Sequence, residues 1–142
     1  MTFDDVVEYM RGDDWPIEPL RERTFRTSFR GRLRSFPFFV HVDGLHLVLA
    51  AVPYVRIPSD ESAADRLMDR LLHMNREMNL AKFSVDDDGD VVLSVEWPLA
   101  ELDPSELRDA IAVLTFYADE YWPEIARLAG EPEVKPMRPP KA

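Results

Sequence analysis

A run of acidic residues at Asp86–Asp90 is the first group of side chains in this chain that could bind an ion. A calcium loop has an aspartate at its first position and a bidentate glutamate at its twelfth. Counting back from Gly89 as the sixth position puts Ser84 first and Val95 twelfth, so neither position fits. A solvated hairpin tip is the simpler interpretation, and the sequence predicts no metal and no cofactor.

Two of the three histidines, His41 and His46, would face each other across a hairpin if Asp43-Gly44 forms its turn. Such a pair could contribute to a zinc site, but a catalytic zinc needs a third protein ligand, and Asp43 is the only candidate nearby. Cross-strand histidines on a partly covered face are the alternative interpretation. The chain also has no cysteine, no phosphate-binding loop and no evident nucleophile beside a base. We therefore expect a protein that is not an enzyme.

Arginines are concentrated between residues 21 and 34, in a chain whose formal net charge is −10. Phe25 and Phe29 alternate with these arginines, so their rings should point to the opposite face of a strand. Single-stranded nucleic acid needs aromatic rings beside the basic groups, and an acidic protein repels it, so we expect no nucleic-acid partner. Two interpretations remain, a solvated sheet edge that resists strand pairing and a docking site for an acidic protein segment. The residues concerned are Arg26, Arg30, Arg32 and Arg34.

The length of 142 residues and the composition, 46% hydrophobic and 31% charged, are those of one globular domain. The first residues lack the basic and apolar regions of a secretory signal. The longest apolar run, Leu47–Tyr54, is far shorter than the about 20 residues that a membrane helix needs. We expect a cytoplasmic protein without a membrane partner. Residues 1–129 should form the domain, and the proline-rich residues 130–142 a flexible tail.

Hydrophobic periodicity and turn residues predict the element order α-β-β-β-α-β-β-α. Residues 13–22, which include two prolines, should be a connector between the first helix and the first strand. The second hairpin should have a three-residue loop at Asp87–Gly89, and the last helix should kink or end at Pro123. This order predicts an α+β fold in which a five-stranded antiparallel sheet carries its helices mainly on one face.

The helix ends and one buried amide have clear sequence signals. Thr2 with Asp5 and Asp103 with Glu106 are predicted capping boxes of the first and last helices. Asn75 falls within the apolar stripe of the second helix. Its amide must find hydrogen-bond partners, and backbone groups of a nearby strand or helix end could supply them.

The hairpin around Asp43-Gly44 is apolar on both faces, which is typical of strands that lie in the middle of a sheet and are covered on both sides. The end of the last helix also has more aromatic side chains than one core face needs. We therefore expect apolar surface left for a protein partner or for a second copy of the chain. The candidate residues are Phe39, Val48, Val52, Tyr54, Phe116, Tyr117, Tyr121 and Trp122.

Several short motifs follow one another in a fixed order between Arg56 and Ile125. They are Leu71-Leu72-x-x-Asn75-Arg76, Phe83, Asp88-Gly89-Asp90-Val91-x-Leu93, Pro98-Leu99, Asp103-Pro104-x-Glu106-Leu107 and the aromatic end of the last helix. This series resembles the YbjN family, whose fold is similar to that of the type III secretion chaperones. The resemblance is loose before Val40 and absent after Gly130.

The resemblance implies a secretion-chaperone-like domain that binds other proteins, often as a homodimer, and it offers no catalytic motif. The family is described as regulators of sensory or stress responses. A non-enzymatic protein-binding module, regulator or chaperone-like, is therefore the leading hypothesis. The alternative is a dedicated type III secretion chaperone for an effector protein, and a third possibility is an enzyme with an unrecognised carboxylate site.

Overall fold

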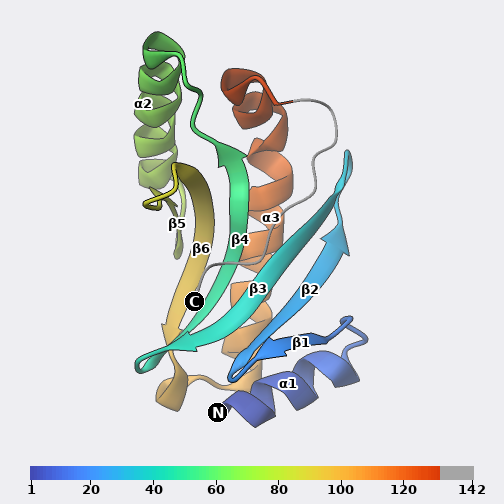
Figure 1. Cartoon of the computed structure of the whole chain (residues 1–142). Helices are drawn as coiled ribbons and strands as arrows, with labels where there is room; N and C mark the ends of the chain where they lie inside the picture. Colours follow the sequence, from blue (N-terminus) through green and yellow to red (C-terminus); the bar gives the residue numbers. More distant parts are fainter. Residues whose placement is uncertain (132–142) are drawn as a thin grey trace.

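The computed structural model describes residues 1–131; residues 132–142, which include nearly all of the predicted tail, lie outside the described residues. Six strands form one antiparallel sheet in the order β1-β2-β3-β4-β6-β5 (Figure 1). The predicted class is confirmed, but the sheet has six strands where we expected five. The elements are α1 (Phe3–Gly12), β1 (Glu18–Arg21), β2 (Thr24–Arg30), β3 (Ser35–Asp43), β4 (His46–Arg56), α2 (Glu61–Glu77), β5 (Ala81–Val85), β6 (Asp90–Pro98), a 3-10 turn at Leu99–Glu101 and α3 (Pro104–Ala129).

The sixth strand is β1, and it corrects the prediction that residues 13–22 are only a connector. Pro19 lies in this strand and cannot donate a hydrogen bond to the ladder. An edge position tolerates a proline, and β1 is the edge strand that pairs only with β2. Pairing with β2 therefore makes a strand of a segment that has almost no strand pattern of its own.

The turn between β3 and β4 is one residue later than predicted. Its central residues are Gly44 and Leu45, so that Asp43 pairs with His46. Gly44 has a φ of +59°, which suits the first central position of a type II′ turn. As a consequence His41 pairs with Val48, and the predicted facing pair of histidines is not formed.

The β5–β6 hairpin has the predicted register, with Phe83 opposite Leu93, and Gly89 has the positive φ of a bulged turn. The acidic tip is held by its own hydrogen bonds, because Asp86 Oδ1 accepts from the backbone N–H groups of Asp88 and Asp90 at 2.9 and 3.0 Å. Carboxylate oxygens of these three residues lie within 4.8 Å of one another. These hydrogen bonds account for the close approach of the three carboxylates, because they fold the segment into a turn. They favour the interpretation of the acidic run as a hairpin tip.

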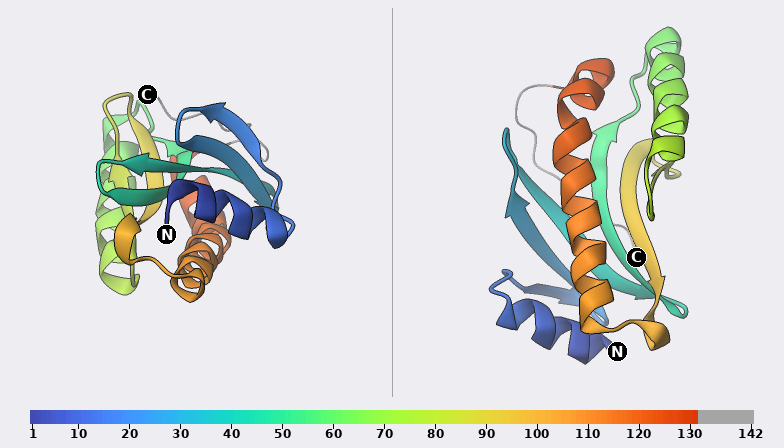
Figure 2. Two further views of the ribbon diagram at one scale, coloured as in Figure 1. Left: turned by 90° about the horizontal axis from the view of Figure 1, so that it is seen from below. Right: turned by 180° about the vertical axis from the view of Figure 1, so that it is seen from behind.

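The three helices all contribute side chains to the core on the same face of the sheet (Figure 2). Both predicted capping boxes are confirmed. Pro123 does not end α3, which continues to Ala129. A proline leaves the carbonyl four residues earlier without its helical donor, and here the Arg32 side chain donates to that carbonyl, Asp119 O, at 3.3 Å. Within the described residues, no helix is both long and apolar enough to span a membrane.

Candidate functional site

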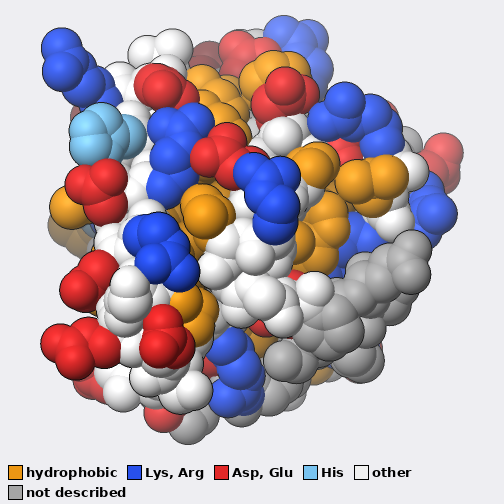
Figure 3. Space-filling view, turned by 90° about the horizontal axis from the view of Figure 1, so that it is seen from above, with side chains coloured by type: hydrophobic (Ala, Val, Ile, Leu, Met, Phe, Trp, Pro, Cys, Tyr) orange, Lys and Arg blue, Asp and Glu red, His pale blue; other side chains and the backbone are white. Residues whose placement is uncertain are grey.

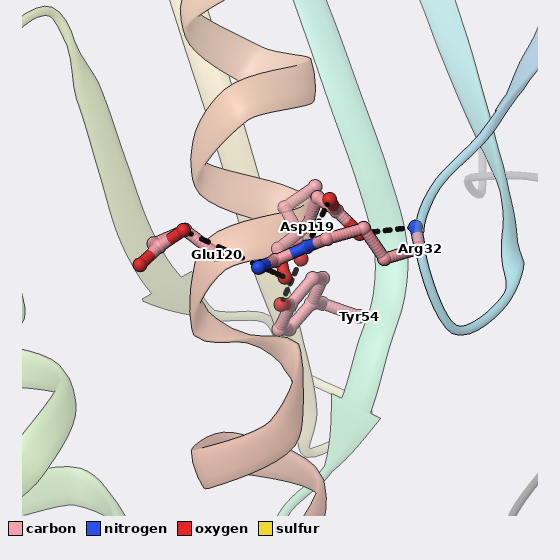
Figure 4. A network of polar contacts seen from close by, with 5 residues as sticks. Arg32, Tyr54, Asp119 and Glu120 are labelled. Carbon is pink, nitrogen blue, oxygen red and sulfur yellow. Dashed lines mark hydrogen bonds and ion pairs between the residues drawn. The ribbon is translucent and has the colours of Figure 1, made fainter.

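A polar network joins the β2–β3 turn to the middle of α3 beside Pro123 (Figure 4). The backbone N–H of Arg32 donates to Asp119 Oδ1 at 2.8 Å, and its Nε donates to Asp119 Oδ2 at 2.9 Å. From β4, the Tyr54 hydroxyl donates to the carbonyl of Ala118 at 2.6 Å. Burial raises the pKa of Tyr54 well above its usual value, so the hydroxyl stays a neutral donor. These groups bind one another, and we interpret the network as a structural joint.

The predicted docking site of four arginines needs correction. Arg34 is only 5% exposed, and its guanidinium lies over the rings of Trp122 and Phe36 at 4.5 and 5.2 Å. Arg32 pairs with Asp119, and Arg26 forms an ion pair with a carboxylate of the neighbouring edge strand. For Arg32 and Arg34 the reason is that the β2–β3 turn lies against α3 and brings both side chains next to acidic or aromatic side chains. Basic and acidic side chains are mixed on this end of the molecule (Figure 3).

The aromatic residues predicted to form a partner surface are mostly used inside the molecule. Tyr54 and Trp122 belong to the core, where their rings lie 5.5 Å apart, so their prediction as surface residues is wrong. Tyr117 and Tyr121 are half-buried and hold the end of α2. The hydroxyl of Tyr117 accepts from a backbone N–H just after α2, and that of Tyr121 donates to a carboxylate at its last residue. Only Phe116 of this group is well exposed, at 60%.

The apolar residues on the other face of the central strands are buried as well. Phe39 is 0%, Val48 8% and Val52 6% exposed. These side chains alternate along β3 and β4 with those that face the helices. The expectation that they leave an exposed apolar area is therefore wrong.

The exposed members of the two predicted surfaces meet in one hollow. Arg30 and Phe116 both line an open depression between the β2–β3 turn and α3, together with Phe29 and Thr115. The sequence placed these residues in two separate candidate sites, because nothing local indicates that the turn lies against α3. A partner surface at Phe116 and a docking role for Arg30 stay predictions.

Four exposed apolar side chains on or next to α2 and β5 were not predicted from the sequence. Among the described residues, seven large apolar side chains are exposed, and four of them lie on α2, at its end or on β5. We call these four the α2–β5 patch: Met68, Leu72, Leu80 and Val85. A signal was present, because apolar residues at positions 67, 68, 71 and 72 make a stripe wider than one neighbouring strand can cover.

The free edge of β5, beside this patch, is closed by a side chain. Asn75 Nδ2 donates to the carbonyl of Phe83 at 3.1 Å, and its Oδ1 accepts from the Phe83 N–H at 2.7 Å. The predicted partners of the Asn75 amide were backbone groups of a strand or of a helix end, and the structure shows that a strand supplies them. The amide takes the two groups that a further strand would need at this position. Since the opposite edge strand contains Pro19, neither edge of the sheet favours strand addition.

The half-buried imidazole of His41 is the remaining titratable group of interest on the sheet. Burial lowers the pKa of His41, with a smaller opposing effect from Asp43. Among the described residues its Nδ1 has no hydrogen-bond partner. Since His46 pairs with Asp43 at the turn, the two histidines are not positioned as a metal-binding pair.

The fold and its surfaces define a small α+β domain with closed sheet edges and an apolar patch beside one of them. The chain matches the model of the YbjN family, described as "Putative bacterial sensory transduction regulator", over residues 2–127. The protein therefore belongs to the YbjN family. No curated protein matches its sequence significantly.

Two solved structures contain chains with a similar fold. One is "Structure of the HopA1-SchA Chaperone-Effector Complex", with a TM-score of 0.59 and 15% identity over 86% of this chain and 94% of the other. The second is "Crystal Structure of the ExsC-ExsE Complex", with a TM-score of 0.60 and 17% identity over 87% of this chain and 92% of the other. At such identities the likeness shows the fold, as the family resemblance implied.

Proposed function

We propose that this protein is a non-enzymatic protein-binding module of the cytoplasm, regulatory or chaperone-like in its action. The observation that carries the proposal is the α2–β5 patch, in which Leu72 is 70% exposed. Isolated apolar side chains are common on protein surfaces, but grouped ones indicate an interaction site. Membership of the YbjN family and the fold of the two structural neighbours support it.

The surroundings of the patch fit a protein partner. Met68 and Leu72 are four residues apart, so they lie on one stripe of α2, and Asn75 continues this stripe to β5. Charged side chains such as Asp69 and Arg76 flank the stripe and are exposed. An apolar centre with a polar rim is the usual composition of a protein interface.

A second copy of the chain is the partner we propose first. Two copies related by a two-fold axis can place the same stripe of α2 against itself, so one self-complementary patch is enough for a closed dimer. Because Asn75 closes the β5 edge, the contact would be made by side chains of α2 and β5 and not by a continuous sheet.

Light scattering coupled to size-exclusion chromatography tests the dimer. The natural chain should be a dimer at micromolar concentration, and Leu72→Glu should make it a monomer, because a buried charge without a partner is costly. Leu45→Glu is the matched control, since Leu45 is similarly exposed but lies in the turn between β3 and β4. A monomeric natural chain, or equal effects of both variants, would contradict the dimer.

A second candidate is a dedicated chaperone of a secreted effector, favoured by the fold likeness to a chain of a chaperone–effector complex. Its test is co-expression with effector candidates encoded nearby. The natural chain should keep such an effector soluble, and Leu72→Glu should lose this ability. A gene neighbourhood without any secretion apparatus would argue against this candidate.

A further inference from the structure

One exposed basic side chain and one exposed apolar side chain line the same open depression, beside the polar network that joins the β2–β3 turn to α3 (Figure 4). Arg30 is the last residue of β2, and Phe116 lies in α3, so the two come from segments far apart in the sequence. Phe29 and Thr115 line the same depression, whose volume is about 620 Å³. We call these four residues the turn–helix hollow.

The two walls of the hollow are held together by a close contact. A Cβ atom added to Gly31 would lie 2.5 Å from Asp119 Oδ1 and 2.7 Å from a ring carbon of Phe36. A glycine is therefore needed for the β2–β3 turn to lie this close to α3. The two hydrogen bonds from Arg32 to the Asp119 carboxylate fasten the same contact. The hollow is thus formed before a partner arrives, which lowers the conformational cost of binding.

Arg30 supplies the charge of the hollow. Its side chain is exposed, and among the described residues no carboxylate pairs with its guanidinium. The nearby Arg32 differs, because it forms ion pairs with Asp119 and Glu120. A single available guanidinium suits a carboxylate, which it can bind through two parallel hydrogen bonds, whereas phosphate groups in peptides are usually bound by clusters of arginines.

Phe116 supplies the apolar part of the hollow. Its ring is 60% exposed, although the other large apolar side chains of α3 are buried or half-buried. The ring of Phe29 is half-buried and stacks on that of Phe36 at 5.2 Å, so it is a fixed part of the lining. Aromatic rings in such a lining favour contact with another aromatic or large apolar side chain.

We propose that the turn–helix hollow binds a segment of a partner protein in which an aspartate or glutamate lies beside an aromatic or large aliphatic residue. The carboxylate pairs with Arg30, and the apolar side chain packs on Phe116. The depression is too open to enclose a small molecule, so its occupant is a side chain presented by a larger chain. The formal net charge of −10 repels an acidic segment at long range, but salt screens this repulsion beyond about 8 Å, whereas the contact with Arg30 is direct.

This site is separate from the α2–β5 patch. On α3, the hydroxyl groups of Tyr117 and Tyr121 bind the end of α2, and the hollow lies on the other flank, beside the β2–β3 turn (Figure 2). A dimer formed through α2 therefore leaves the hollow of each copy open. The inference rests on the proposed protein-binding function, but it names the chemistry of a partner other than a second copy and does not require the dimer.

Peptide selection followed by NMR tests the proposal. A phage library of short random peptides is selected on the natural chain, and each enriched peptide is then titrated into the isotope-labelled chain. The enriched peptides should share an acidic residue beside an aromatic or large aliphatic one. Their titration should shift the NMR signals of Arg30, Thr115 and Phe116 and leave those of Leu72 on α2 unchanged.

Single substitutions test the two parts of the hollow. Arg30→Gln should weaken the binding of an enriched peptide about tenfold, because a charge-assisted pair of hydrogen bonds is lost. Phe116→Ser should also weaken it, because the apolar side chain of the peptide loses its contact. Arg76→Gln is the matched control, since it removes an exposed arginine of α2, and it should leave the affinity unchanged.

Gly31→Ala tests the shape of the hollow, because it keeps both binding side chains but should push the turn away from α3 and weaken binding. Circular dichroism checks that this variant is folded, and Arg30→Gln, which changes only an exposed side chain, decides if it is not. A selection that enriches no peptide, enriched peptides without acidic residues, or equal losses for Arg30→Gln and Arg76→Gln would overturn the proposal. Shifts confined to Leu72 and its neighbours would also overturn it but would support binding at the α2–β5 patch, so failure here and failure of the proposed function are distinguishable.

Discussion

Two helices of this domain meet the same sheet in very different ways. The contact between α3 and the sheet is rich in aromatic rings, with Trp122, Phe36 and Tyr54 packed edge to face or in parallel. The contacts of α2 include no aromatic side chain of its own; beside its buried apolar residues, Asn75 binds β5 and Arg70 binds Glu124 of α3. Both helices have a buried apolar side, but α2 exposes two large apolar side chains four residues apart, Met68 and Leu72, whereas α3 exposes one, Phe116.

The difference follows from position in the sheet. α3 lies over the central strands β4 and β6, so strands extend on both sides beneath it. α2 contacts the edge strand β5 and has no strand beyond it. The part of the α2 apolar stripe that extends beyond β5, at Met68 and Leu72, is therefore exposed. Both helices contribute to the core, but α2 leaves part of its apolar stripe exposed, and substitutions should separate these two parts of the molecule.

The largest expected effect is at the α3 contact. Trp122→Ala should lower the free energy of unfolding by about 3–5 kcal/mol, because it empties a site surrounded by buried side chains. Urea denaturation measures this loss. Phe116→Ala on the exposed side of the same helix should change the stability by less than about 1 kcal/mol. Similar losses for the two variants would contradict the assignment of α3 as the stabilising helix.

The next effect is at the α2 contact. Asn75→Ala should lower the free energy of unfolding by about 1–3 kcal/mol, because the N–H and carbonyl of Phe83 lose both partners. Hydrogen exchange should accelerate at the Phe83 amide. Asn79→Ala is the control, since Asn79 is exposed just after α2. An unchanged exchange rate at Phe83 would show that the Asn75 amide does not close the β5 edge.

Features encoded by neighbouring residues were predicted well from the sequence, and features that depend on distant contacts were not. The capping box at Asp103 and the loop ending at Gly89 need only their own segment, and both are confirmed. Asn75 was recognised because an amide in an apolar stripe requires partners. β1 was missed because it exists only through pairing with β2, and the burial of Arg34 because it requires the β2–β3 turn to lie on α3.

A smaller effect is expected for the polar joint at α3. Tyr54→Phe keeps the ring in the core and removes only the hydroxyl that donates to the carbonyl of Ala118. The free energy of unfolding should fall by about 1 kcal/mol, the usual net value of one hydrogen bond. Self-association should not change, because Tyr54 is buried far from solvent. A change in the dimer constant without a loss of stability would reverse the division of roles between α3 and α2.

The smallest effect concerns the ion pair between the two helices. The hydrogen bond from Arg70 lowers the pKa of Glu124 below its ordinary value. A carboxylate whose pKa is lower in the folded than in the unfolded protein stabilises the fold at any pH above its pKa in the unfolded chain, about 4.3. This stability is lost as the pH falls through the pKa of the group in the folded protein. Because both groups are partly exposed, Arg70→Gln should cost only about 0.2–1 kcal/mol at pH 7.

The pH dependence separates this ion pair from packing. The stability difference between the natural chain and Arg70→Gln should shrink as the pH falls through the lowered pKa of Glu124, because Glu124 then becomes protonated in both proteins. Arg108→Gln is the control, because Arg108 is exposed and contacts only its neighbour Asp109 among the ion pairs of the described residues. A difference that stays constant over the whole acid range in which the protein remains folded would mean that the stem of Arg70 holds α2 by packing and that its charge contributes nothing.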